Sequence, residues 1–154
     1  SVAAPVLVVV VSQRCQYALR LALLLTRGPG RGYVPVRDLA ETLGTPGAFL
    51  SKVAQDLTRA DLLTTKRGPG GGVALARAPS AISLLDVVLA IDGPDAFRAC
   101  VLGLPGCGIE APCPLHDEWA AARTRLRHMF ADTTLADATS DPEGPVARLS
   151  AVGG

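Results

Sequence analysis

The sequence has few aromatic residues, few lysines and no long hydrophobic run. Aromatic side chains make up 4% of its 154 residues, and only two of its 15 basic residues, Lys52 and Lys66, are lysines. The one strongly apolar run outside helical patterns is VLVVVV, residues 6–11, whereas a helix that spans a bilayer needs roughly 20 residues. We therefore expect no membrane segment. An apolar share of 49% is still sufficient for the core of one small domain.

We also expect no export signal at the start of the chain. No basic residue precedes the apolar run, as one would in a signal peptide. We therefore expect residues 1–11 to be an N-terminal extension, a short strand or disordered, of a cytoplasmic protein. Because thiols stay reduced in the cytoplasm, the four cysteines indicate a metal or redox site rather than a disulfide framework.

Apolar residues at helical spacing predict three helices between residues 12 and 62. The first follows Ser12, a candidate cap. The second ends near Gly44, and the third is expected to have Thr45 as its cap and Pro46 as its first residue. The second and third helices, joined by a tight turn, form a candidate helix-turn-helix.

A glycine-rich hairpin follows. The stretch LLTTKRGPGGGVALAR predicts one strand at residues 62–66 and another at residues 73–77. A phosphate-binding nucleotide loop would need a lysine followed by Ser or Thr at the start of a helix, which this stretch does not have. A hairpin after a helix-turn-helix is a wing. The predicted fold is therefore mainly α with a small β-hairpin, a winged helix-turn-helix domain over residues 12–78.

Charge differs between the two halves of the chain. Between residues 45 and 77, five basic side chains stand against two acidic ones, and between residues 92 and 118 one arginine stands against five acids. A basic half with a helix-turn-helix and a wing can meet the phosphates of double-stranded DNA. The alternative is an ordinary solvated surface.

The remaining sequence predicts a helix over residues 80–93, a loop over 93–112 and a long helix that begins at Cys113 or Pro114. The long helix carries a seam with coiled-coil spacing: Leu115, Trp119, Ala122, Leu126 and Met129. The seam can pack on its own core or join two copies, and we expect a homodimer, which suits DNA binders that read two half-sites. We assign residues 79–137 to this loop and dimerisation helix, and residues 138–154 to a flexible tail.

The loop concentrates cysteine. The stretch CVLGLPGCGIEAPCPLH contains Cys100, Cys107, Cys113 and His116. Thiolates are the ligands of iron–sulfur clusters, and Cys113 at the predicted helix start gains thiolate character from the helix dipole. His116 shares its helical face and can add a nitrogen ligand. Three cysteines and a histidine also form a zinc set, although the usual paired spacing is missing, and unligated thiols are the third alternative.

These features together resemble a known family. The wing KRGPGGGVALAR, the earlier YALRLALLL and LAETLG…FLSKVAQDL, and the cysteine loop look like bacterial winged-helix regulators of the IscR/NsrR/RirA type over about residues 12–137. The resemblance implies a homodimeric transcription factor that binds a DNA operator and senses cluster status, redox state or nitric oxide. It implies an iron–sulfur cluster, expected to be 2Fe–2S, on the three cysteines and one further ligand. The first gap, Cys-x6-Cys, departs from the shorter spacing usual in the family.

The resemblance offers candidates for the further ligand. His116, in CPLH…W, matches the position used in the IscR-like branch. In the NsrR-like branch an acid of the partner subunit, just before the YA of the first helix, serves instead. Here that position is Gln16, a poor ligand. The neighbouring Cys15 is either a thiolate donor or a buried helix cysteine.

DNA contacts carry over by position from the same resemblance. Lys52 can contact guanine or phosphate, and Gln55 can read adenine. Ser51 stands where an IscR-like member has an acid used in site discrimination, so the preferred DNA sequence should differ. The full set combines the recognition helix, the wing and two phosphate contacts: Ala48, Ser51, Lys52, Gln55, Arg67, Pro69, Ser12 and Arg14. The alternative is that several of them are only surface polar residues.

Two other function classes remain open. A cluster-free or zinc-bound regulator that acts partly through a protein partner fits the same sequence features. An electron-transfer iron–sulfur protein would have no use for a helix-turn-helix and a wing. We expect no enzyme, because no nucleophile–base pair stands out.

Overall fold

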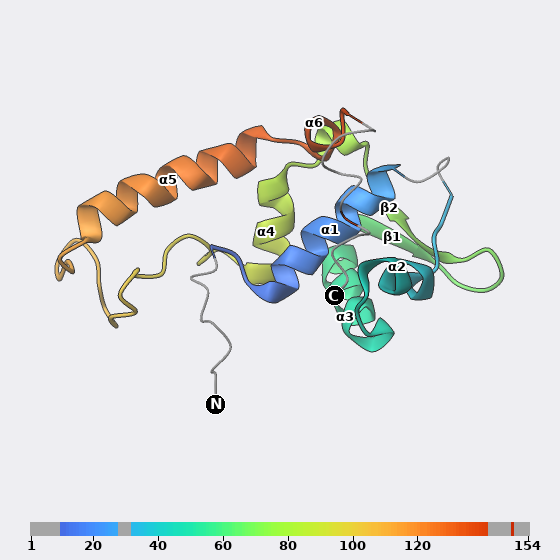
Figure 1. Cartoon of the computed structure of the whole chain (residues 1–154), viewed down its shortest axis with the longest axis horizontal. Helices are drawn as coiled ribbons and strands as arrows, with labels where there is room; N and C mark the ends of the chain where they lie inside the picture. The colour runs from blue at the N-terminus through green and yellow to red at the C-terminus, as the bar shows by residue number, and fades with distance from the viewer. Residues whose placement is uncertain (1–9, 28–31, 142–148, 150–154) are drawn as a thin grey trace.

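The computed structural model describes residues 10–27, 32–141 and 149 (Figure 1). The predicted extension up to residue 9, the turn at residues 28–31 and most of the predicted tail lie outside this part of the chain. The described helices are α1 (Gln13–Arg27), α2 (Val36–Leu43), α3 (Gly47–Arg59), the short 3-10 helix η1 (Pro79–Ala81), α4 (Leu84–Asp92), α5 (His116–Asp132) and α6 (Leu135–Ala138), and the strands are β1 (Leu63–Lys66) and β2 (Gly72–Leu75). The predicted fold class, mainly α with a hairpin wing, is confirmed. None of the helices within the described residues is long and apolar enough to cross a membrane.

The helix-turn-helix forms as predicted, with one shifted boundary. Ser12 caps α1, because the backbone N–H of Cys15 donates to its hydroxyl at 3.1 Å, and Gly44 ends α2 in the left-handed conformation at φ 65°. We expected Thr45 to cap α3 and Pro46 to be its first residue, and both are wrong, because the cap position is Pro46 and no side chain caps the helix. The ψ of Pro46, 137°, is extended, so this residue precedes the first turn and α3 begins at Gly47. The three helices and the wing share one core: Leu21, Leu43, Leu50, Leu57 and Val73.

The wing is a two-stranded antiparallel hairpin in which Leu63 pairs with Leu75 and Lys66 with Gly72. Its second strand starts one residue earlier and ends two residues earlier than predicted. Val73 also exchanges two 2.9 Å backbone hydrogen bonds with Val34, the residue that leads into α2. Gly72 has a φ of 142°, and a Cβ there would lie 2.1 Å from the Val34 carbonyl oxygen. Only glycine fits at this junction between the wing and the helices.

The C-terminal half extends from this body along α4 and α5. Ser83 and Asp86 form a capping box at the start of α4, which packs against α1 and α5. Helix α5 begins at His116, later than predicted, because residues 114 and 115 form a turn. Figure 1 shows α5 and the loop before it at one end of the longest axis and the wing at the other. Any influence of the loop on the wing must therefore travel through the helices.

Candidate metal centre and DNA-binding face

The loop between α4 and α5 brings three cysteines together. Among the described residues, the Sγ atoms of Cys100, Cys107 and Cys113 lie within 4.8 Å of one another. Gly103 and Gly106 have φ values of 70° and 72°, the left-handed conformation that glycine adopts without strain. These two positions let the backbone double back between the first and second cysteines. The spacing of the sequence therefore corresponds to a real convergence of sulfur atoms.

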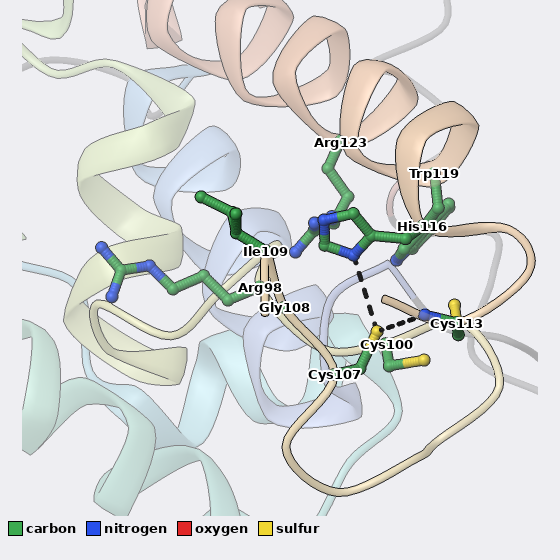
Figure 2. A pocket seen from close by; sticks show the side chains of 9 residues that line it. All are labelled: Arg98, Cys100, Cys107, Gly108, Ile109, Cys113, His116, Trp119 and Arg123. Atoms are coloured by element: carbon green, nitrogen blue, oxygen red, sulfur yellow. Dashed lines mark hydrogen bonds between the residues drawn. The ribbon is translucent and has the colours of Figure 1, made fainter. Parts of the chain in front are cut away.

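The three cysteines line a pocket of about 370 Å³ (Figure 2). The loop supplies the sulfur side, and α5 supplies three side chains to the other side, His116, Trp119 and Arg123. Arg98 and the strongly exposed Ile109 complete its rim. A charged, half-enclosed pocket of this kind can hold a metal ion or a small cluster while leaving one side open to solvent.

His116 lies beside the cysteines as its spacing predicted. Its Nδ1 is 3.5 Å from the Sγ of Cys107, and the same sulfur accepts a hydrogen bond from the backbone N–H of Cys113 at 3.4 Å. The four predicted ligands thus share one pocket in a single chain. Whether the imidazole ligates stays a prediction.

The cysteines differ in acidity. Backbone hydrogen bonds from Leu104 and Leu102, which outweigh partial burial, lower the pKa of the Cys100 thiol to about 7. Burial raises the pKa of Cys113. We expected the helix dipole to favour the thiolate at Cys113, and the structure contradicts this. The helix starts three residues beyond Cys113, and burial of its sulfur dominates.

The donor set fits both candidate groups. Two sulfurs bound to one tetrahedral zinc ion, each at about 2.3 Å, lie about 3.8 Å apart, which is inside the observed limit of 4.8 Å. Iron–sulfur clusters take thiolates from loops of this kind. The pocket also holds a buried donor without an acceptor in the described residues, the Nε of Arg123. The positive charge of this arginine, with no carboxylate among the described lining residues, suits a group with negatively charged sulfur.

Cys15 stands apart from this centre. It is fully buried on α1, where it packs with Val11, Val88 and Ala96. Burial, reinforced by the negative charge of Asp92, raises the pKa of its thiol to about 12. Within one chain, Cys15 is a core residue, in agreement with the plainer of its two interpretations.

The predicted DNA-contacting residues of α3 and the wing are mostly exposed. On α3, the side chains of Ala48, Lys52 and Gln55 are exposed and Ser51 is half-buried. In the wing, Arg67 and Pro69 occupy the exposed turn between the strands. Helix and turn therefore present polar and basic groups without any cost to the core.

The two predicted phosphate contacts already have partners in the chain. Ser12 donates to Asp92 from its hydroxyl and, at 2.9 Å, from its backbone N–H. Arg14 forms an ion pair with Asp56 of α3, which also pairs with Arg59 at 2.8 Å. A phosphate would have to compete with these carboxylates. No local pattern indicates these contacts, because their members lie 42 and 80 residues apart.

The profile of a family described as "Iron-dependent Transcriptional regulator", Rrf2, matches residues 11–141. The chain belongs to the Rrf2 family. Because this is a family of transcriptional regulators, the expectation that the chain is not an enzyme is confirmed. The resemblance to IscR-type regulators is confirmed as well.

Curated relatives agree with this assignment. An HTH-type transcriptional regulator of Mycobacterium tuberculosis is 38% identical over 128 residues, which are 82% of this chain and 78% of the relative. The HTH-type transcriptional regulator IscR of Escherichia coli is 30% identical over 129 residues, 83% of this chain and 78% of the relative.

Solved structures agree on the fold. CymR, described as the global cysteine regulator of B. subtilis, superposes with a TM-score of 0.70 at 25% identity, over 84% of this chain and 95% of CymR. IscR of T. potens superposes with a TM-score of 0.69 at 25% identity, over 86% of this chain and 88% of that protein. The helices and the wing are thus arranged as in other Rrf2 proteins.

Sequence reasoning missed two residues of the Rrf2 chain's pocket. The Nε1 of Trp119 donates to the carbonyl oxygen of Ala99 at 2.7 Å, and the Nη1 of Arg123 donates to that of Phe97 at 3.0 Å. A signal was available, since residues 116, 119 and 123 share one face of a helix. The prediction placed Trp119 in the dimer seam and gave Arg123 no role.

Proposed function

We propose that this Rrf2 regulator binds operator DNA as a homodimer and that an iron–sulfur cluster in the cysteine pocket controls the binding. The observation that supports this most is the convergence of three sulfurs and His116 in one pocket against α5. Thiolates and an imidazole would hold the cluster, which supplies a group that responds to iron supply, redox state or nitric oxide. Such a regulator works in the cytoplasm, where its DNA is and where free thiols persist.

DNA recognition in this proposal uses α3 and the wing. Lys52 and Gln55, both exposed, read base edges or phosphates in the major groove. Arg67, at the exposed turn, reaches the adjacent minor groove, where arginine is favoured. Two copies joined through α5 would place two such surfaces on the two half-sites of an operator.

The coupling between cluster and DNA depends on the two helices that flank the cysteine loop, α4 and α5. The pocket and the wing lie at opposite ends of the molecule along its longest axis (Figure 1). Within one chain, the cysteine loop therefore does not touch the wing. It is continuous, however, with α4 and α5, and α4 packs on α1 and α3 of the DNA-binding domain. Ordering of the loop can thus change how the two wings of a dimer are spaced. Couplings between sites are typically about 1–3 kcal/mol, or roughly 5–150-fold in affinity.

The test begins with the visible spectrum and the iron and sulfide content of protein isolated without oxygen. Operator sites selected from genomic DNA are then titrated with holo, apo and Cys107→Ala protein. We expect holo and apo protein to differ at least about fivefold, and Cys107→Ala to behave as apo. Cys15→Ala is the matched control, because it removes a thiol outside the pocket, and it should keep the cluster. Superimposable curves for all proteins at all sites would show that the cluster is not the switch.

His116→Ala tests the fourth ligand. We expect this variant to form a cluster that is less stable or has a lower potential, because nitrogen ligands raise cluster potentials. A variant with the spectrum and stability of the wild type would place the fourth ligand elsewhere.

A second candidate is a zinc-bound or cluster-free regulator that acts partly through a protein partner. The sulfur spacing supports it, because three sulfur atoms within 4.8 Å of one another fit a single zinc ion as well. Colourless protein with one zinc per chain, or with free thiols and no metal, would establish this candidate over the first.

A further inference from the structure

Helix α5 holds the backbone just before Cys100 by two hydrogen bonds. Trp119 and Arg123, one helical turn apart, donate to the carbonyl oxygens of Ala99 and Phe97 at 2.7 and 3.0 Å. Residues 97–99, which accept these hydrogen bonds, belong to no helix or strand in the described structure. The position of the first cysteine therefore depends on these two side chains of the helix.

Arg123 has a second feature that its hydrogen bond to Phe97 does not explain. Its Nε is fully buried and has no hydrogen-bond partner in the described structure. The side chain lines the same pocket as the three cysteines and His116 (Figure 2). Among the described residues that line this pocket there is no carboxylate, so its charge has no acidic counterpart there. A buried donor left without an acceptor is costly, at about 1–3 kcal/mol.

We propose that Arg123 is a positioning residue of the cysteine centre, which holds Cys100 in place through Phe97 and sets its positive charge beside the bound group. The proposal rests on the function proposed above, because it needs a metal or cluster in the pocket. Thiolates or a cluster there supply the negative charge that the described lining residues do not.

The proposal has a measurable electronic consequence. Hydrogen bonds to the sulfurs and the net charge around a cluster set its reduction potential. Reduction adds negative charge to the cluster. A fixed cation beside the cluster therefore stabilises the reduced form, and its removal lowers the potential. A residue that only shapes the loop would alter cluster retention without this directed shift.

The experiment compares Arg123→Gln with Arg127→Gln. Both remove one positive charge from α5, but Arg127 is exposed and does not line the pocket. For Arg123→Gln we expect the ratio of reduced to oxidised cluster at a fixed solution potential to fall about tenfold. This corresponds to a reduction potential lower by about 59 mV for a one-electron couple. Loss of the cluster to EDTA should also be several-fold faster. Arg127→Gln should stay within about twofold of the wild type in both measurements.

Arg123→Lys separates charge from geometry. It keeps the cation but not the planar geometry of the guanidinium, so we expect a potential between those of the wild type and Arg123→Gln. Thermal unfolding of the apo proteins checks that the variants fold. Equal potentials and equal release rates in Arg123→Gln and Arg127→Gln would overturn the proposal and leave the sensor function intact.

The two proposals fail differently. If the wild type holds zinc instead of a cluster, the sensor proposal fails, and the rate of zinc release to EDTA tests Arg123. Faster release from Arg123→Gln than from Arg127→Gln supports the role of Arg123. Equal release from the two variants overturns it. A wild type that retains neither zinc nor a cluster overturns both proposals.

Discussion

Four cysteines of one chain differ because of what surrounds each sulfur. Cys15 is fully buried among apolar side chains, whereas Cys100 accepts backbone hydrogen bonds in a loop. The first environment disfavours the thiolate and the second favours it. The sequence spacing separated the loop cysteines from Cys15, and the structure adds the physical reason why they serve different purposes.

The buried thiol of Cys15 should make stability fall at high pH. Its pKa is about 12 in the folded chain against an ordinary value of 9.0. Below pH 9 both states keep the proton, so the stabilisation is complete there. Between pH 9 and 12 only the unfolded chain loses the proton, and the free energy of unfolding falls by about 1.4 kcal/mol per pH unit.

The measurement is denaturant unfolding of apo wild type and Cys15→Ala at pH 8 and pH 10. From the linkage relation we expect the wild type to lose about 1.4 kcal/mol more than the variant between these values. The packing cost of the substitution is the same at both pH values and cancels. Parallel losses would mean that the Cys15 thiol ionises as freely in the folded chain as in the unfolded one.

Arg67 carries the prediction for DNA binding at this scale. It is exposed in the wing turn, so its removal costs the fold little. Arg67→Ala should weaken operator binding by roughly 1–3 kcal/mol if it enters a groove, or reduce the salt slope by about 1 if it meets a phosphate. Filter binding or anisotropy at several salt concentrations measures both. Arg125→Ala, an exposed charge on α5, is the control, and equal effects would remove Arg67 from the contacts.

At the scale of elements, local patterns predicted most of the fold. Glycine placement and apolar spacing identified α1, α2, α3 and the wing, because each element depends mainly on its own residues. The ends of elements and the contacts between them were less accessible. Pro46 stands outside α3 because of its backbone angle, and Arg14 meets Asp56 only after folding.

The centre shows the same limit. The three cysteines and His116 lie within 17 residues, so their spacing was enough to predict one site. The role of Arg123 depends on how α5 returns over the loop to reach Phe97. No local sequence pattern predicts how α5 packs over the loop.

Gly72 links the wing to α2, and its replacement should loosen that junction. Gly72→Ala would place a Cβ 2.1 Å from the Val34 carbonyl oxygen, at a φ of 142° that other residues rarely adopt. We expect a loss of more than about 1 kcal/mol in stability and weaker operator binding. Gly47→Ala is the control, since its Cβ would meet nothing within 4 Å, and alanine favours a helix. Equal stability of both variants in denaturant unfolding would contradict the assigned role.

At the scale of the whole molecule, α5 carries two neighbouring stripes. One stripe serves its own chain: Trp119 and Arg123 bond the loop, and Phe130 packs on Phe97 with ring centroids 5.4 Å apart. The other runs along the predicted seam, where Leu115 and Met129 are 44% and 53% exposed in a single chain. No residue of α5 is fully buried. A long helix with an uncovered apolar stripe supports a second copy as its partner.

The dimer prediction is tested on this second stripe. Ala122→Asp with Met129→Asp places two charges seven residues apart in the seam, and the exposure of Met129 keeps the cost to the single chain small. Burial of these charges should weaken the dimer by roughly 3 kcal/mol or more, about a hundredfold in dissociation constant. Ala121→Asp with His128→Asp repeats the spacing on the exposed opposite face and should leave the dimer intact. Sedimentation at micromolar concentration decides between the pairs, and a wild type that sediments as a monomer would contradict both the seam and the reading of two half-sites that depends on it.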